Sequence, residues 1–538
     1  MSQKSLSRSL LVLAILWLGY LMIGAFISPP NIGYDAGNGV LDLLHFKDGG
    51  RFQHHDFPAF DQESDCLERR TTWWSPGQWF FAYIIHLTGI PLGFSYALLA
   101  CLSIGFGVLG WTKVFERFKM EPSLLALAAC IMLFSRFNYS QVMIFSGASV
   151  LEFGVAPWIL LLWFWFEEKH FMLRLASIIA ITVAGYFVKS SLLILILGLT
   201  LHAAYVAYNN GKRWEGVFSY PAAFIAGKFT CDLLFVGNGR TPFDIESQWF
   251  AGFSDPLMEC AQSLLFILAS PLVSGFGLED YINYIVKRPG AEILLDGSAG
   301  LVLLYGILAV LSIVLVTHFF LANRKITTEY KEFLFFIGGV SLGFVAFSWL
   351  AGKPISVSEE SRHIRVAGLL FLPIVLTYFE AFFKKAIWII PIGLLAYGTL
   401  SHWSKVKREK VILPELQFAL SEIEDMGAWG IFSELVDSSD FYYVINADWK
   451  FVHPSCRGFF AHDDFRTVQV IMNRSKIYLD EESIVFLLPA RFRHNGKRDA
   501  ITERFQPAQT GLKKSILVHE FDDWDVIQLK YSMDMEEN

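Results

Sequence analysis

Charged residues are scarce in this sequence, and they form no basic stripe. Asp, Glu, Lys and Arg make up 18% of the 538 residues, and they gather in the connections between apolar segments and in the C-terminal part. Recognition of nucleic acid requires a continuous basic surface that neutralises phosphates. The distribution of charge therefore argues against a nucleic-acid partner, and the net charge of −7 adds little.

Cysteine is also sparse, and no two of the six cysteines form a CxxC pair. Cys101, Cys130 and Cys231 lie in apolar segments, where cysteine acts as a small packing residue. The other three fall in regions that we predict to be extracytoplasmic, where a disulfide is permitted but not implied. Internal repeats and low-complexity tracts are absent as well, whereas many transporters are built from inverted repeats.

The sequence instead contains many separate apolar segments of near 20 residues. Hydrophobic residues make up 54% of the chain and aromatic residues 16%. A helix of that length crosses a hydrocarbon core of about 30 Å. We therefore predict an all-α polytopic membrane bundle of about 11 transmembrane helices over residues 1–403. After residue 404 the alternating runs at 441–445 and 483–488 predict a small soluble α/β or α+β domain that reaches residue 538.

The first apolar helix, over residues 10–27, sets the predicted topology. Lys4 and Arg8 precede it, which places the N-terminus in the cytoplasm, and no small-residue cleavage site follows it. Residues 28–94 then form a long extracytoplasmic loop, with a surface helix near 77–89. The basic connections 113–119, 169–174 and 212–213 fall on the cytoplasmic side. We expect a multi-pass protein of a bacterial inner or plasma membrane.

The stretch 237–298 is the least regular part of the predicted bundle. Glycines and prolines interrupt it, and one apolar piece lies near 258–275. We interpret it as an outer loop with a partly inserted helix. If that piece crosses the membrane, the sidedness of all later segments is reversed. With eleven spans, the C-terminal domain is periplasmic.

Asp35 stands just beyond the first helix, at the predicted boundary between lipid and water. A carboxylate there can take a proton from an acceptor hydroxyl or hold a metal near a phosphate. The alternative is a loop aspartate that caps the following helix.

Two further ionisable residues, Glu152 and Lys189, interrupt apolar sequence near the outer face. Ionisable groups at membrane depth are costly and usually line a cavity. For Lys189 the alternative is an extended side chain that reaches the interface. Lys228 and Asp232 lie one helical turn apart, which predicts a structural ion pair.

Arg362-His363-Ile364-Arg365 opens a late helix at its predicted outer end. Its cations are suited to binding a phosphate or pyrophosphate, although an ordinary interfacial cluster has the same composition. The His54-His55-Asp56 run contains metal-ligand residue types, but adjacent residues rarely bind one ion together. No cofactor follows from the sequence, and a divalent metal remains an open alternative.

The order of these residues resembles that of the GT-C superfamily of integral-membrane glycosyltransferases, which includes protein O-mannosyltransferases and lipid A aminoarabinose transferases. The Tyr34-Asp35 pair is similar to the acidic motif that opens the family's long first loop. Glu68 and the segment from Trp73 to Trp79 resemble its element before a surface helix, without the common His-Pro-Pro or Glu-Lys-Pro pattern. Glu152 resembles the second outer acid, and Lys189 the lysine after the next helix.

The resemblance implies a polyprenyl-phosphate-linked sugar as donor, inversion at the anomeric carbon, and an acceptor hydroxyl on a lipid, glycan or protein at the outer face. Asp35 would be the base, and Glu152 would orient the acceptor or help to bind a divalent ion. The remaining assignments are donor-phosphate binding by Lys189, Arg362, His363 and Arg365, and substrate binding by Tyr34, Glu68 and Arg69. The chain is expected to contact membrane lipids. A transporter or flippase of a lipid-linked or sugar substrate is the alternative, and a non-catalytic membrane scaffold is a third.

Overall fold

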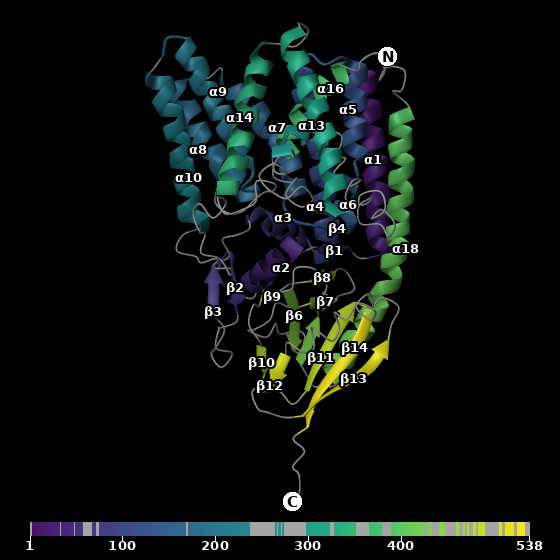
Figure 1. Ribbon diagram of the computed structural model, residues 1–538. Coiled ribbons are helices and arrows are strands. Elements are labelled where there is room, and N and C mark those ends of the chain that lie inside the picture. Colours follow the sequence, from purple (N-terminus) through teal and green to yellow (C-terminus); the bar gives the residue numbers. More distant parts are fainter. Residues whose placement is uncertain are drawn as a thin grey trace, which may run out of the picture.

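The computed structural model describes most of the bundle and a set of C-terminal strands (Figure 1). The described residues are 3–57, 67–70, 75–236, 264–273, 297–322, 328–350, 365–378 and 389–425, apart from 29, 33, 48, 168, 169, 213, 266 and 271, together with strand residues between 429 and 532.

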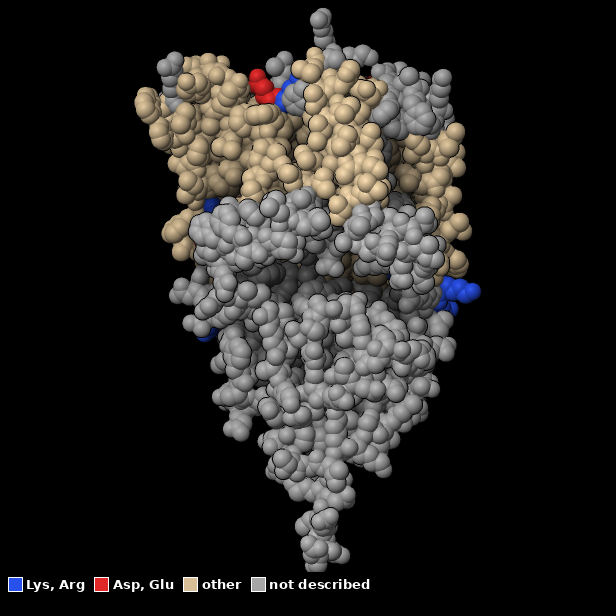
Figure 2. Space-filling view, in the orientation of Figure 1, with Lys and Arg blue, Asp and Glu red and all other residues tan. Residues whose placement is uncertain are grey.

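Apolar helices form the body of the protein. Within the described residues, seven helices are long and apolar enough to cross a membrane. They are α1 (Gln3–Ile27), α4 (Leu92–Arg117), α5 with α6 (Pro122–Phe134 and Arg136–Met143), α7 (Ser149–Glu167), α8 (Phe171–Val188), α9 (Leu192–Asn209) and α14 (Thr328–Leu350). Figure 2 shows that the visible described flank of the bundle is almost free of charged side chains, as expected for a surface that faces lipid. The predicted helical membrane bundle is confirmed.

Four further helical stretches pack beside these seven. They are η1, α10 and η2 in succession (Glu215–Ser219, Tyr220–Cys231 and Asp232–Val236), α13 (Gly297–Ala322), α15 with α16 (Arg365–Leu370 and Leu372–Tyr378) and α18 (Ile389–Asp425). The α10 helix contacts α8, α13 contacts α16, and α18 contacts α1 and α5. Two of these stretches contain shorter apolar helices, Val302–His318 and Arg365–Tyr378.

The apolar segment over residues 122–143, which is long enough for one spanning helix, is divided at Ser135. This residue has φ −57° and ψ 130°, which ends α5 before α6 begins. The Asn138 side-chain amide donates to the carbonyl oxygen of Met132 at 2.6 Å. A polar side chain thus satisfies a carbonyl that the break leaves without a helical partner. The break shows that apolar composition determines membrane crossing more strictly than it determines helix continuity.

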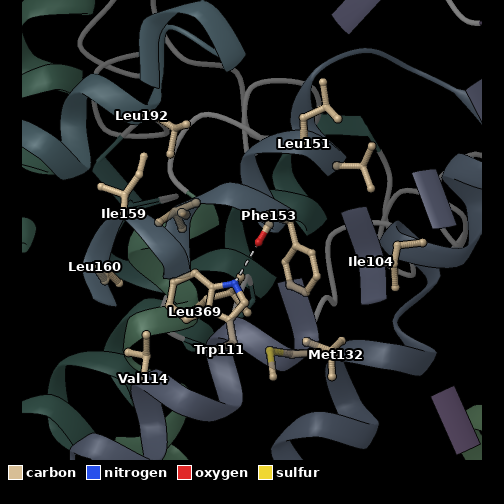
Figure 3. Close-up of a cluster of buried hydrophobic side chains, with 14 of the residues drawn as sticks. Ile104, Trp111, Val114, Met132, Leu151, Phe153, Ile159, Leu160, Leu192 and Leu369 are labelled. Carbon is tan, nitrogen blue, oxygen red and sulfur yellow. Dashed lines mark hydrogen bonds between the residues drawn. The ribbon is translucent and has the colours of Figure 1, made fainter. Parts of the chain in front are cut away.

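A proline in α7 explains the close contact between α4 and α7. Pro157 has no N–H, so the carbonyl of Phe153, four residues earlier, loses its helical donor. The indole nitrogen of Trp111 on α4 donates to that carbonyl at 3.2 Å (Figure 3). Glycine allows the approach, because a Cβ at Gly107 would lie 2.5 Å from the Phe153 ring and one at Gly110 2.7 Å from Pro157.

The long first loop lies across one end of the bundle (Figure 1). Its described elements are β1 (Asn31–Ile32), α2 (Tyr34–Lys47), β2 (His54–Phe57), β3 (Leu67–Arg70) and α3 (Gly77–His86). Ala36, Val40 and Leu43 are fully buried and follow helical spacing, so α2 buries one face. The helix α3 lies within the segment 77–89, where a surface helix is predicted.

A small sheet joins this end of the bundle to the C-terminal part of the chain. Its strand order is β4-β1-β8-β7, where β4 is Ile144–Phe145, β8 is Arg466–Val468 and β7 is Phe459–Ala461. The central strand β1 runs parallel to both β4 and β8. In Figure 1 the N-terminus lies at the opposite end of the bundle. The described C-terminal strands and the first loop therefore share one side of the bundle (Figure 1).

A second, six-stranded sheet lies farther from the bundle. Its order is β13-β14-β11-β5-β6-β9. The strands are β5 (Trp429–Phe432), β6 (Phe441–Asn446), β9 (Ile471–Met472), β11 (Ser483–Pro489), β13 (Leu512–Glu520) and β14 (Trp524–Ser532), and β10 (Ile477–Leu479) pairs separately with β12 (Phe505–Pro507). The alternating runs at 441–445 and 483–488 are strands, as predicted. The α18 helix continues past residue 404, the predicted domain boundary, to Asp425.

Candidate functional site

Glu152 and Lys189 form an ion pair inside the bundle. Glu152 lies in the first turn of α7, and Lys189 directly follows the last residue of α8. The Lys189 ammonium nitrogen is 2.8 Å from a Glu152 carboxylate oxygen, and the two side chains are 10% and 3% exposed. The structure thus joins two of the predicted site residues, and it excludes the alternative in which Lys189 extends to the interface.

Two serines complete this pair. Lys189 donates to the hydroxyl of Ser149 at 2.9 Å, and the hydroxyl of Ser191 donates to the second Glu152 oxygen at 2.8 Å. Both carboxylate oxygens therefore accept a hydrogen bond, as a buried charge requires. The sequence analysis missed both serines, although Ser149 precedes Glu152 by one helical turn and Ser191 is two residues after Lys189.

The start of the surface helix α3 is anchored beside this pair. The backbone N–H of Ser190 donates to the hydroxyl of Ser75 at 2.9 Å. A Cβ at Gly77 would lie 2.7 Å from the carbonyl oxygen of Phe187, so glycine is needed for the contact. The Ser-Pro-Gly part of the element that resembles the family motif thus touches the end of α8. Trp73 and Trp74 lie outside the described residues.

The backbone of Tyr34 and Asp35 begins α2, directly after β1. Asn31 pairs with Ile144 and Ile32 with Phe145 in a parallel register. The carboxyl ends of β1 and β4 therefore meet at one edge, where α2 begins and where the chain leads on to Ser149 and Glu152. The backbone of Asp35 lies in the first turn of α2.

Glu68 and Arg69 lie in β3 of the first-loop hairpin. Their backbones pair with those of Asp56 and His55, respectively, in β2. The next residue, Arg70, donates from its guanidinium to the carbonyl oxygen of Leu234 in η2. This bond ties the hairpin to the end of the α10 stretch. Within the part of the chain that the structure describes, no three His, Cys, Asp or Glu residues are grouped to hold a metal ion.

Arg365 is the first residue of α15, as the sequence predicts, but its side chain is buried among helices instead of lying at a membrane surface. It is 3% exposed, and its guanidinium carbon is 3.0 Å from the centre of the Phe137 ring on α6. Packing of α15 against α7 and α14 carries the side chain inward. Arg362 and His363 lie outside the described residues.

A second acid on α2, Asp42, also escaped the sequence analysis. It is 2% exposed, although it belongs to a loop expected to face water. It follows Asp35 by seven residues, which is two helical turns. The seven-residue spacing from Asp35, together with the apolar spacing of Ala36, Val40 and Leu43, is the sequence signal that could have identified Asp42 as a buried acid.

Two other expectations are met by the described residues. Lys228 and Asp232 form the predicted i,i+4 ion pair. Cys101, Cys130 and Cys231 are free and buried, in agreement with packing roles.

Comparison with known proteins gives one structural similarity. No protein-family model matches the sequence, and no curated protein matches it. A crystal structure of ArnT from Cupriavidus metallidurans bound to undecaprenyl phosphate is similar over 96% of this chain and 97% of that chain, with 11% sequence identity and a TM-score of 0.42.

Proposed function

We propose that this protein is a membrane glycosyltransferase that moves a sugar from a polyprenyl-phosphate donor to an acceptor hydroxyl. The reaction takes place at the end of the bundle that carries α2, α3 and the small sheet. One observation carries the proposal: the chain that leads to the buried Glu152–Lys189 pair leaves β4, and β4 pairs with β1, directly before the start of α2 that contains Asp35. An acid for proton abstraction and a cation for a phosphate are thus available on one side of the membrane.

Lys189 is the residue that stabilises the leaving phosphate. Negative charge develops on the phosphate oxygen as the bond to the sugar breaks, and a nearby ammonium lowers that barrier. The effect is larger in a buried site than in water, because the effective dielectric constant is lower. Glu152 and Ser149 hold the ammonium in place. The sequence also predicts phosphate binding by Arg362, His363 and Arg365. Of these three residues, the structure describes Arg365 on α15.

Glu152 acts as a positioning residue for Lys189. Both of its carboxylate oxygens accept hydrogen bonds, from Lys189 and from Ser191. This arrangement orients the lysine. It fits a positioning role better than the acceptor or metal contact that the family resemblance implies.

Asp35 is the base that activates the acceptor hydroxyl. The backbone of Asp35 lies in the first turn of α2, and the positive end of a helix dipole favours negative charge at that position. A base must be ionised before it takes a proton. Attack by the activated hydroxyl on the anomeric carbon then displaces the polyprenyl phosphate in one step, with inversion.

The proposed orientation places this site outside the cytoplasm. The basic connections at 113–119, 169–174 and 212–213 belong to the opposite end of the bundle, where the positive-inside rule places the cytoplasm. The membrane is then a bacterial inner or plasma membrane, and the acceptor is a lipid, glycan or protein that presents its hydroxyl on the outer side.

Replacement of Asp35 by Asn tests the proposal in cells that depend on this protein. The expected result is loss of a surface glycan at an unchanged level of membrane-inserted protein, measured by mass spectrometry of total glycans. Asp232→Asn is the matched control, since it also removes one carboxylate at a membrane helix. An unchanged glycan with altered uptake of a lipid-linked or sugar substrate would reject the transferase and support a transporter.

A further inference from the structure

A cavity lies at the end of the bundle opposite the first loop. Its volume is about 100 Å³, enough for several water-sized groups. Helices α7, α8 and α9 and the start of α10 form its walls, at the level where α8 begins and α9 ends. It is separate from the Glu152–Lys189 pair, which lies near the other ends of α7 and α8.

The cavity combines an apolar interior with a polar rim. Trp163 and Tyr220 are buried, and the Tyr220 ring meets the Phe171 ring edge-on with centroids 5.9 Å apart. Arg174, Asn210 and Lys212 supply the polar lining. Among the described residues that line the cavity there are two cations and no carboxylate. Such a lining is suited to an anionic group attached to apolar chains.

Exposed aromatic residues place this cavity at a membrane interface. Trp214 and Phe218 are both strongly exposed, and their rings are stacked with centroids 5.4 Å apart. Aromatic side chains of this kind gather where lipid headgroups meet the hydrocarbon. Met172 and Leu173 directly precede Arg174 on α8, and their exposed side chains provide an apolar surface for acyl chains.

We infer that this cavity binds the phosphate of an anionic phospholipid from the leaflet at the N-terminal end of the bundle. Arg174 and Lys212 contact the phosphate oxygens, and Asn210 donates to the headgroup. The acyl chains lie along the exposed start of α8. Basic pockets between membrane helices recognise anionic headgroups in this way, because a guanidinium pairs well with phosphate and each nearby cation adds to the attraction. The inference does not depend on the proposed transferase activity.

The test measures lipid binding by the purified full chain in detergent. Phosphatidylglycerol and phosphatidylcholine are added separately, and retained lipid is counted by native mass spectrometry while thermal unfolding is followed in parallel. We expect phosphatidylglycerol, and not phosphatidylcholine, to remain bound and to raise the unfolding temperature. Arg174→Gln with Lys212→Gln is expected to weaken phosphatidylglycerol binding by about tenfold or more.

The matched control is Lys113→Gln with Lys119→Gln, which removes two charges at the same end of the bundle but outside the cavity. It is expected to bind phosphatidylglycerol like the unmodified protein. Equal loss of binding in both double variants would overturn the inference, since it would indicate attraction by overall charge. Competition by millimolar inorganic phosphate with equal strength would also overturn it in favour of a free anion. If the double variant does not fold, Lys212→Gln alone carries the test, because Lys212 is exposed.

Discussion

Each end of the bundle carries a lysine–glutamate pair, and the two pairs have opposite physical character. At the end with the first loop, Lys189 and Glu152 are 2.8 Å apart and almost completely buried. At the other end, Lys113 and Glu116 are 3.4 Å apart on one turn of α4, with side chains 65% and 40% exposed. A buried pair must hold its geometry because each charge has given up water, whereas an exposed pair exchanges freely with solvent. The charges of Lys189 and Glu152 are therefore held in fixed positions, as a binding or catalytic site requires.

Removal of one partner from each pair should give the largest difference between the two ends. Lys189→Met leaves the Glu152 carboxylate buried without its cation, and we expect a loss of about 3–5 kcal/mol in the free energy of unfolding. Thermal and denaturant unfolding in detergent measure it. Glu152→Gln combined with Lys189→Met should restore much of the stability but none of the transferase activity. A Lys189→Met protein as stable as the parent would contradict the buried pair.

Loss of the serine that supports the buried pair should have the next largest effect. In Ser191→Ala one Glu152 oxygen loses its donor, which should cost about 1.5–3 kcal/mol because the acceptor is charged. The neighbouring Ser190 is exposed, so Ser190→Ala is a matched control with an expected change near zero. Equal unfolding free energies for the two variants would show that Ser191 does not hold the carboxylate.

The small sheet exists at one end only, and its disruption should affect activity more than bundle stability. Thr467 lies in β8, which pairs with β1 on one side and with β7 on the other. Thr467→Pro removes the backbone N–H of this residue, and with it a hydrogen bond to one of these two strands. Displacement of β1 shifts the backbone that leads to Asp35, and we expect kcat to fall on the order of tenfold. Transferase assays and thermal unfolding of the same protein separate the two effects. A lower unfolding temperature of the bundle with unchanged kcat would argue against this positioning role.

The exposed pair should give the smallest effect. Lys113→Gln is expected to change the free energy of unfolding by less than about 1 kcal/mol, and the difference should shrink further in high salt. Unfolding of both proteins at low and high ionic strength measures it. A large, salt-independent loss would mean that the two ends are less different than their exposure indicates.

Several features of the fold follow from local sequence. The first span, the surface helix at 77–86 and the strands at 441–446 and 483–489 carry their own signals in apolar length or alternation. The break at Ser135 carries no local signal that outweighs the apolar residues on either side of it. The inward position of Arg365 was missed for the same reason, because a charge at a helix end gives no information on which helices surround it.

The candidate site was only partly accessible from the sequence. Glu152 and Lys189 were recognisable because charge within apolar sequence is costly and needs an explanation. Ser149, Ser191 and Asp42 were not, since a serine or an aspartate near a predicted loop is common. Their significance comes from what they contact and from their burial.

The sequence by itself determined that this chain is a multi-pass helical membrane protein, because apolar length is a local property that each segment carries independently. Only the tertiary structure decided that Lys189 meets Glu152, 37 residues away, and that β8 joins β1 across more than 400 residues of chain. Contacts of that kind depend on how helices pack and on which backbone edges meet. No single segment encodes them.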